Sequence, residues 1–168
     1  MRFNYSAFKA IYLHEMDRFR RTLMQSLLSP VLSTSLYFIV FGSVIGGYVE
    51  KIDGISYGSY IVPGLLMLTL LTQSITNTSF GIFFPKFNGT IYEILAAPIS
   101  TLEIVLAFVG AGATKTLIVG VVIFVTANFF VEVDVKYPFL VIFLLMLVAF
   151  TFALFGFLIG LMLSLIHI

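Results

Sequence analysis

A run of 32 residues without a charged side chain, GISYGSYIVPGLLMLTLLTQSITNTSFGIFFP, occupies positions 54–85. About 20 apolar residues in a helix, at ~1.5 Å per residue, cross the ~30 Å hydrocarbon core of a bilayer, so this run is long enough to span one. Three further stretches have the same character: 22–49 and 137–168 are uncharged, and 104–131 carries a single charge, Lys115. Together they predict four transmembrane helices, at about 23–48, 57–84, 104–130 and 138–162.

The composition agrees with a membrane protein rather than a soluble domain. The chain of 168 residues is 60% hydrophobic and 10% charged, with a mean hydropathy of +1.12, far from the average soluble composition. The predicted fold class is an all-α integral membrane protein. It consists of an N-terminal amphipathic interfacial helix, four transmembrane helices, and a short cytoplasmic helix between the second and third spans.

Charge balance and missing residue types exclude several functions. The net charge of +1 provides no basic field for nucleic acid, and the chain has no cysteine and two histidines, too few for a metal cage. The run GAGATKT at 110–116 superficially resembles a phosphate-binding loop, but Thr114 stands where that motif requires glycine before the lysine. Because the spans hold no carboxylate pair and no Ser-His-Asp set, we expect no catalysis and no nucleotide hydrolysis in this chain.

Basic residues predict the orientation of the spans. Five of the nine Lys and Arg residues precede the first span, whereas the segments 50–53 and 132–136 hold one Lys each. The positive-inside rule therefore places the N-terminus and the loop 85–103 in the cytoplasm, and the two short acidic loops outside. The first 22 residues contain seven charges and no apolar core, so a cleavable signal peptide is not expected.

Residues 1–21 form a segment of their own with an amphipathic pattern. Apolar side chains recur at helical spacing from Phe8 to Phe19, and the basic side chains lie largely elsewhere on the helix. This pattern is typical of a helix that lies in the membrane interface and leads into the first span. The alternative is a solvated helix that covers another protein.

Polar residues inside the first two spans follow helical lines rather than scattering. They are Gln25, Ser29 and Ser33 on the first span, and Thr69, Thr72, Gln73, Thr76 and Asn77 on the second. These faces are expected to avoid lipid. Two interpretations stay open: hydrogen bonds that join helices, or a surface that faces a translocation path or a dimer seam.

Small residues and prolines give weaker signals in the same spans. Gly42 with Gly46, and Gly156 with Gly160, are spaced to permit close helix contact. Pro30 in the first span and Pro63 near the start of the second are expected to kink or start helices.

Lys115 needs its own explanation because a charge at the bilayer centre costs roughly 2.5 to 3.5 kcal/mol. The favoured interpretation is that its side chain snorkels to the cytoplasmic surface. The alternatives are a place in the transport path or a buried pairing with another residue.

The connection between the second and third spans carries the most information. It reads PKFNGTIYEILAAPIS at 85–100, in which Thr90 and Glu93 are spaced as a capping box and Pro98 stops the helix after about two turns. Ile91, Ile94 and Leu95 share one face of this helix. That apolar face is offered to a partner, or it rests on the membrane or the N-terminal helix. Glu93 serves either the cap or a charged partner contact.

This connection resembles the signature of the permease subunits of type-2 ATP-binding-cassette (ABC) exporters. The matching residues are Gly89, Thr90, Glu93, Leu95, Pro98, Ile99 and Ser100, and Pro63-Gly64-Leu65 is similar to the motif that opens that family's second span. The resemblance implies six spans and a permease dimer. It also implies two separate nucleotide-binding subunits that contact this loop as the coupling helix. Phe87 and Asn88 replace the family's usual charged residues before Gly89.

The resemblance assigns roles to particular positions. The segment that contacts the ATPase is expected at Gly89, Thr90, Ile91, Glu93, Ile94, Leu95 and Pro98, and the candidate path or seam is the two polar lines together with Lys115. ATP and magnesium are expected on the partner subunit, and no cofactor in this chain. Because the family has six spans, the chain is expected to be a fragment that lacks the C-terminal spans, with its permease domain at 1–162. The last residues, LSLIHI at 163–168, resemble a translated library adaptor, so His167 is assigned no function.

The sequence thus predicts the permease of an exporter in a prokaryotic inner membrane, with an ABC-type ATPase, a second permease copy and membrane lipid as partners. Its substrate would be a polysaccharide, a lipid or a drug-like molecule. The alternative is a structural or assembly membrane protein that recruits a cytoplasmic partner through residues 89–100. An integral membrane enzyme is a much weaker third interpretation.

Overall fold

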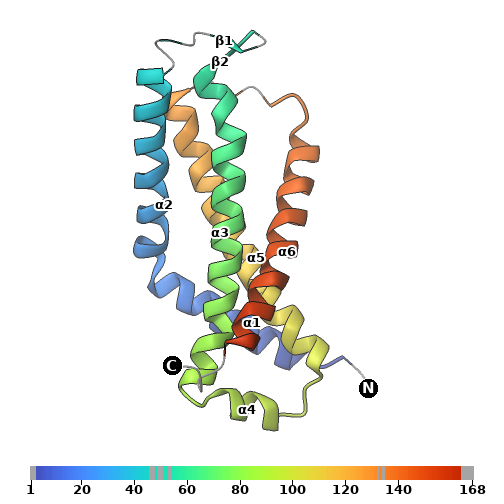
Figure 1. Cartoon of the computed structure of the whole chain (residues 1–168). Helices are drawn as coiled ribbons and strands as arrows, with labels where there is room; N and C mark the ends of the chain where they lie inside the picture. The colour runs from blue at the N-terminus through green and yellow to red at the C-terminus, as the bar shows by residue number, and fades with distance from the viewer. Residues whose placement is uncertain are drawn as a thin grey trace.

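The computed structural model describes residues 3–45, 48, 51–52, 54–131, 133 and 135–163. Its elements, in chain order, are α1 (Tyr5–Arg21), α2 (Leu23–Tyr37), the π-helix η1 (Phe38–Ile45), β1 (Lys51–Ile52), β2 (Ile55–Ser56), α3 (Tyr57–Phe87), α4 (Ile91–Ala96), α5 (Thr101–Phe130) and α6 (Pro138–Met162). Four long helices stand side by side, α1 crosses them near one end, and α4 lies beyond that end (Figure 1).

The four predicted spans are confirmed as helices of sufficient length and apolarity. They are Leu23–Gly42, Tyr57–Phe87, Thr101–Phe130 and Pro138–Met162, and α2 continues without a break into η1. The second span runs to Phe87 rather than 84, and the third begins at Thr101 rather than 104. Gly46, the acidic positions 50, 53, 132 and 134, and the tail beyond Leu163 lie outside the described residues.

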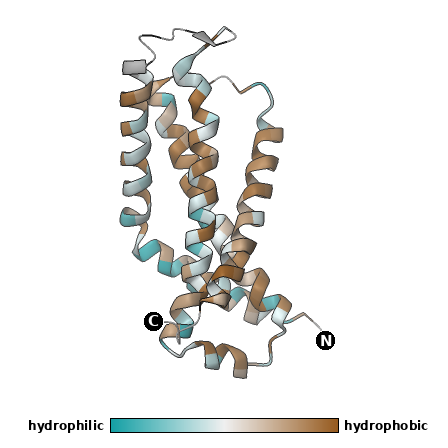
Figure 2. Cartoon of the chain, in the orientation of Figure 1, coloured by the Kyte–Doolittle hydropathy of each residue, from teal (hydrophilic) through white to brown (hydrophobic). Residues whose placement is uncertain are grey.

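The hydrophobic core forms around α5, which packs against α1, α2, α3 and α6. Its buried face is built from small and β-branched residues, including Ala107, Val109 and Val119. Exposed large apolar side chains cover the outward faces of α2 and α6, as expected for surfaces in contact with lipid. Figure 2 shows α6 hydrophobic over most of its length, whereas hydrophilic residues gather where α1 meets α2 and in the lower half of α3.

Glycines bring α6 close to α3, as the Gly156–Gly160 pair predicts. A Cβ atom at Gly156 would lie 2.5 Å from the carbonyl oxygen of Ile75, and one at Gly160 would lie 2.7 Å from that of Ser79. At the same end of α6, Lys86 Nζ donates hydrogen bonds to three of its last carbonyl oxygens, at 2.7 to 3.2 Å. The lysine therefore satisfies groups that the end of a helix leaves unpaired. Gly42, in contrast, has no atom of the described residues within 4 Å of an added Cβ.

A short hairpin joins the first two spans at the end opposite α4. Lys51 pairs with Ser56 and Ile52 with Ile55, and Gly54 adopts a positive φ of 83° in the turn. These two strands are not among the elements predicted from the sequence. Ser56 then caps α3, because its side chain accepts a hydrogen bond from Ser59 N at 3.2 Å.

Candidate functional site

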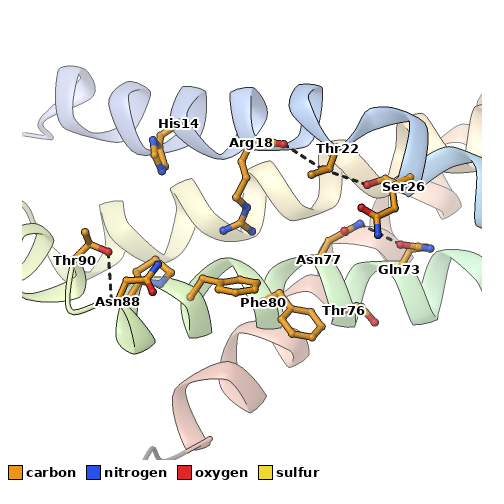
Figure 3. Close-up of a pocket in the computed structure, with 13 residues that line it drawn as sticks. His14, Arg18, Thr22, Ser26, Gln73, Thr76, Asn77, Phe80, Asn88 and Thr90 are labelled. Carbon is orange, nitrogen blue, oxygen red and sulfur yellow. Dashed lines mark hydrogen bonds between the residues drawn. The ribbon is translucent and has the colours of Figure 1, made fainter.

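The two polar lines of the sequence face a common trough between α2 and α3. Two adjoining cavities, of about 730 and 270 Å³, share Gln73 in their walls. The larger lies toward α4, and ten of its thirteen lining residues are polar or charged: His14, Arg18, Thr22, Gln25, Ser26, Gln73, Thr76, Asn77, Asn88 and Thr90 (Figure 3). The smaller receives the hydroxyl-bearing residues Ser29, Ser33, Thr34, Tyr37, Thr69 and Thr72. Every residue of both predicted lines therefore lines the trough.

Hydrogen bonds of the α3 line remain within α3. Thr69 Oγ1 donates to the carbonyl of Leu65 at 2.8 Å, and Thr72 Oγ1 donates to that of Leu68 at 2.9 Å. Asn77 Nδ2 lies 3.5 Å from Gln73 Oε1, one turn away. Among the residues that the structure describes, none of these hydrogen bonds reaches α2. This pattern speaks against hydrogen bonds that join the two helices, and it leaves a polar surface open toward the trough.

Lys115 does not snorkel, and the prediction that it does is wrong. Its side chain is 4% exposed, and its Nζ lies 2.7 Å from Glu15 Oε2 on α1, whose side chain is 2% exposed. The ammonium group is therefore buried and paired, which was one of the alternatives left open. It also does not line the trough, so it is not part of the candidate path.

Glu15 is not among the residues predicted from the sequence, although its position on α1 carries a signal. Glu15 lies on the same helical face as the apolar residues Ile11, Tyr12 and Phe19, and a carboxylate in the middle of an apolar face is rarely left without a partner. That face of α1 packs against α5 of the same chain. Tyr12 Oη also donates to Thr114 Oγ1 at 3.0 Å.

Arg18 connects this buried pair to the trough. Its Nη2 lies 3.0 Å from the same Glu15 oxygen that binds Lys115, and its guanidinium carbon lies 5.7 Å from the centre of the Phe84 ring. The Arg18 side chain remains one-third exposed, at 33%. Figure 3 shows it extending from α1 toward α3, with His14 on one side and Thr22 on the other.

The segment between α3 and α4 turns at Gly89, whose φ of 78° favours glycine. The predicted capping box at Thr90 and Glu93 is wrong. Thr90 has helical dihedrals and makes no side-chain cap bond, and its hydroxyl donates back to the carbonyl of Pro85 at 3.4 Å. Helix α4 ends at Ala96, two residues before Pro98, as predicted.

A capping box does occur ten residues later, at the start of α5. Ser100 Oγ accepts from Glu103 N at 3.4 Å, while Glu103 Oε2 accepts from Ser100 N at 2.8 Å. The other carboxylate oxygen of Glu103 accepts from Asn4 N at 2.5 Å. Asn4 is itself the N-cap of α1, so one buried carboxylate joins the first turns of α1 and α5.

The three residues of the predicted apolar face of α4 do not have the same surroundings. Ile91 and Ile94 pack against the core cluster that includes Ile82 and Phe108, so they attach α4 to the bundle. Leu95 is exposed, at 63%, and Tyr92, which the sequence analysis did not select, is 73% exposed. A partner that approaches α4 therefore meets Tyr92, Glu93 and Leu95 rather than the two isoleucines.

The described part of the chain holds no group of three or more His, Asp or Glu side chains that could bind a metal. The polar groups of the trough are hydroxyls and amides, with one guanidinium and one imidazole at the α4 end. Such groups can bind and orient a ligand by hydrogen bonds and charge.

Comparison with known proteins places this arrangement in a family context. A family model described as "ABC-2 type transporter" matches residues 6–168. Matching curated proteins include the inner membrane transport permease YadH of Escherichia coli K12 and that of Shigella flexneri, each 38% identical over 154 residues. The alignment covers 92% of this chain and 60% of each of these relatives. No solved structure matches significantly.

Proposed function

This chain belongs to the ABC-2 type transporter family, and from that premise we propose that it is the membrane-spanning permease of an ATP-driven exporter. It would act in the prokaryotic inner membrane as one half of a homodimer surrounded by lipid, with its N-terminus and α4 in the cytoplasm. ATP and magnesium would bind to a separate ATPase subunit, and this chain would not be an enzyme. Its substrate would be a polysaccharide, a lipid or a drug-like molecule.

The observation that carries this proposal is the position of α4. The helix lies between two long apolar helices and beyond the end of the bundle (Figure 1). Ile91 and Ile94 attach it to the core, while Tyr92 and Leu95 are left uncovered. Because its inner face is anchored and its outer face is free, a force applied by a partner at α4 would reach the spans directly.

Within the proposed contact, the residues named from the family resemblance take different roles. Tyr92, Glu93 and Leu95 would touch the ATPase, since their side chains are exposed. The inner isoleucines would hold the helix in place, and Gly89 would set its direction through the turn.

The trough supports transport over a purely structural role. A protein that only recruits a partner needs no polar surface inside the membrane, where unpaired polar groups are costly. Here Thr69 and Thr72 satisfy their hydroxyls within α3 and still face an open cavity. We assign this trough to the substrate path.

The test is co-expression of this chain with the ABC-type ATPase encoded in its genomic neighbourhood. We expect the two to co-purify, and we expect cysteines at Tyr92 or Leu95, but not at Ile94, to crosslink to the ATPase. Leu95→Asp should weaken co-purification, because it places a charge in an apolar contact. Ile55→Asp is the matched control, since Ile55 is similarly exposed at the opposite end of the bundle.

Failure of every α4 cysteine to crosslink, together with unchanged co-purification of the Leu95→Asp variant, would refute the coupling role. If the ATPase co-purifies through α4 but no candidate substrate changes its hydrolysis rate, the assembly function is favoured instead.

A further inference from the structure

The trough has an uneven charge distribution along its length. The part formed by Ser29, Ser33 and Thr72 has hydroxyl groups and, among the described residues of its walls, no charged side chain. At the α4 end, the walls contain Arg18 and His14, and the described residues that line this cavity include no carboxylate. Any charge that the trough presents to a ligand is therefore positive and is located at one end.

The buried pair keeps this positive charge available. Glu15 contacts both cations, Lys115 at 2.7 Å and Arg18 at 3.0 Å, through the same oxygen. Two cations and one carboxylate leave one net positive charge. Lys115 belongs to α5 and is buried against Glu15 of α1, so the part of this charge that a ligand can reach is on the one-third-exposed Arg18.

The surroundings of Arg18 supply further hydrogen-bonding groups from three elements. His14 and Thr22 flank it along the chain, Gln25 and Ser26 belong to α2, and Asn77 belongs to α3 (Figure 3). An arginine fork with amide and imidazole N–H groups around it is well matched to an anion that has several oxygen atoms, such as a phosphate group. A carboxylate, with two oxygens, would use fewer of these groups.

We propose that the Arg18 end of the trough is a binding site for a phosphate-type anionic group. It would be carried by a membrane amphiphile or by a soluble phosphate compound. Arg18 contacts the anion, Glu15 positions Arg18, and Lys115 acts through Glu15 by offsetting its charge. The polar walls beyond Arg18 then accommodate the hydrogen-bonding part of the same ligand. This site would be part of the proposed substrate path, and the inference rests on that path being open to ligands.

The test is ligand binding to the whole purified chain in a nonionic detergent, followed by native mass spectrometry. Phosphatidylglycerol is the amphiphile probe, and diacylglycerol with the same acyl chains is its phosphate-free counterpart. Inorganic pyrophosphate, as a competitor and as a ligand by itself, tests the soluble source. We expect phosphatidylglycerol or pyrophosphate to bind, and diacylglycerol to bind much more weakly.

Variants then locate the site. Arg18→Gln is expected to weaken binding about tenfold or more, because it removes a charge-assisted contact. Arg20→Gln is the matched control: it makes the same charge change on the same helix, but Arg20 does not line the cavity. Lys115→Met should also weaken binding although it lies outside the trough, since Glu15 is then free to neutralise Arg18. A structural role for Lys115 would not produce this effect in a folded variant.

Folding of each variant is checked by helicity and by elution from a sizing column. Should Arg18→Gln fail to fold, Arg18→Lys keeps the charge but loses the fork, so intermediate binding is expected from it. Binding that depends on Arg18 with phosphatidylglycerol identifies a lipid source, and the same dependence with pyrophosphate alone identifies a soluble one. Equal effects of the changes at Arg18 and Arg20, or equal binding of diacylglycerol, would overturn the site. These measurements involve no ATPase, so such a failure would leave the permease proposal standing.

Discussion

Replacement of Glu15 by Gln is expected to destabilise the chain more than replacement of Lys115 by Met. Without the Glu15 carboxylate, the Lys115 amine loses its ion-pair partner in a position that is 4% exposed. Removing one member of a buried ion pair typically costs about 3 to 5 kcal/mol. After Lys115→Met, Glu15 keeps Arg18 at 3.0 Å, so we expect a smaller loss of about 1 to 3 kcal/mol.

The double variant gives the sharper test. With Glu15→Gln and Lys115→Met combined, no uncompensated charge is buried between α1 and α5, so the double variant should be more stable than Glu15→Gln alone. The wild-type chain, the two single variants and the double variant form a double-mutant cycle. The coupling energy from this cycle should be on the order of 2 kcal/mol, as for residues in direct contact. Unfolding of the chain in mixed micelles by increasing dodecyl sulfate, followed by helicity, measures each corner of the cycle.

Exposed charges of the same helix provide the controls for this cycle. Lys9 and Asp17 are both exposed on α1, and surface pairs contribute about 0 to 1 kcal/mol. Lys9→Met and Asp17→Asn should therefore change stability little. Strictly additive losses at Glu15 and Lys115, with a coupling energy near zero, would show that the two groups do not pair in the folded chain, and the reasoning would fail.

Three further predictions concern caps, packing and topology. Ser100→Ala should cost about 0.5 to 2 kcal/mol in the same unfolding assay, whereas Thr90→Ala should be near neutral, since Thr90 makes no cap bond; equal losses would contradict this assignment. Gly156→Leu should detach α6 from α3 and lower the thermal stability in detergent, because a side chain there meets backbone atoms at 2.5 Å, and wild-type stability would refute the contact. Reporter fusions at Lys51 should report outside and fusions at Asn88 inside, and an outside signal at Asn88 would break the proposed orientation.

The spans could be predicted from the sequence because their signal is local. A bilayer requires a long uncharged helix, and the stretches between charges satisfy that requirement directly. The close contact at Gly156 and Gly160 could be predicted for the same reason, since both glycines lie on one face of one helix. The polar lines of α2 and α3 were visible separately, and the structure adds that they face one trough.

The buried pair could not be predicted because its members are 100 positions apart in the chain. Periodicity shows that Glu15 and Lys115 each occupy an unfavourable position, but it does not show that the two positions meet. A systematic search for charges on apolar faces would have selected both residues. Snorkelling was favoured because it needs only a flexible side chain and a nearby surface.

The two capping-box patterns show a different limit of prediction from sequence. Thr90 and Glu93, like Ser100 and Glu103, fit the same spacing, so sequence alone does not distinguish them. The backbone before each pair decides the outcome. Ser100 is extended, with ψ at 152°, so its hydroxyl can reach the first turn of α5, whereas Thr90 follows the positive-φ turn at Gly89 and is already helical.

The contacts between α1 and α5 explain why Arg18 faces the trough. Asn4 bonds to Glu103 and Glu15 to Lys115, so eleven positions along α1 match twelve along α5. The two helices therefore run side by side in the same direction over this length, about 17 Å at 1.5 Å per residue. With both ends of that length fixed, the rotation of α1 about its own axis is fixed as well. Arg18 comes one turn after the anchored carboxylate and extends toward α3, so its guanidinium lies in the space beside Phe84. The position of the charge at the end of the trough is thus set by contacts made on the neighbouring, buried face of α1.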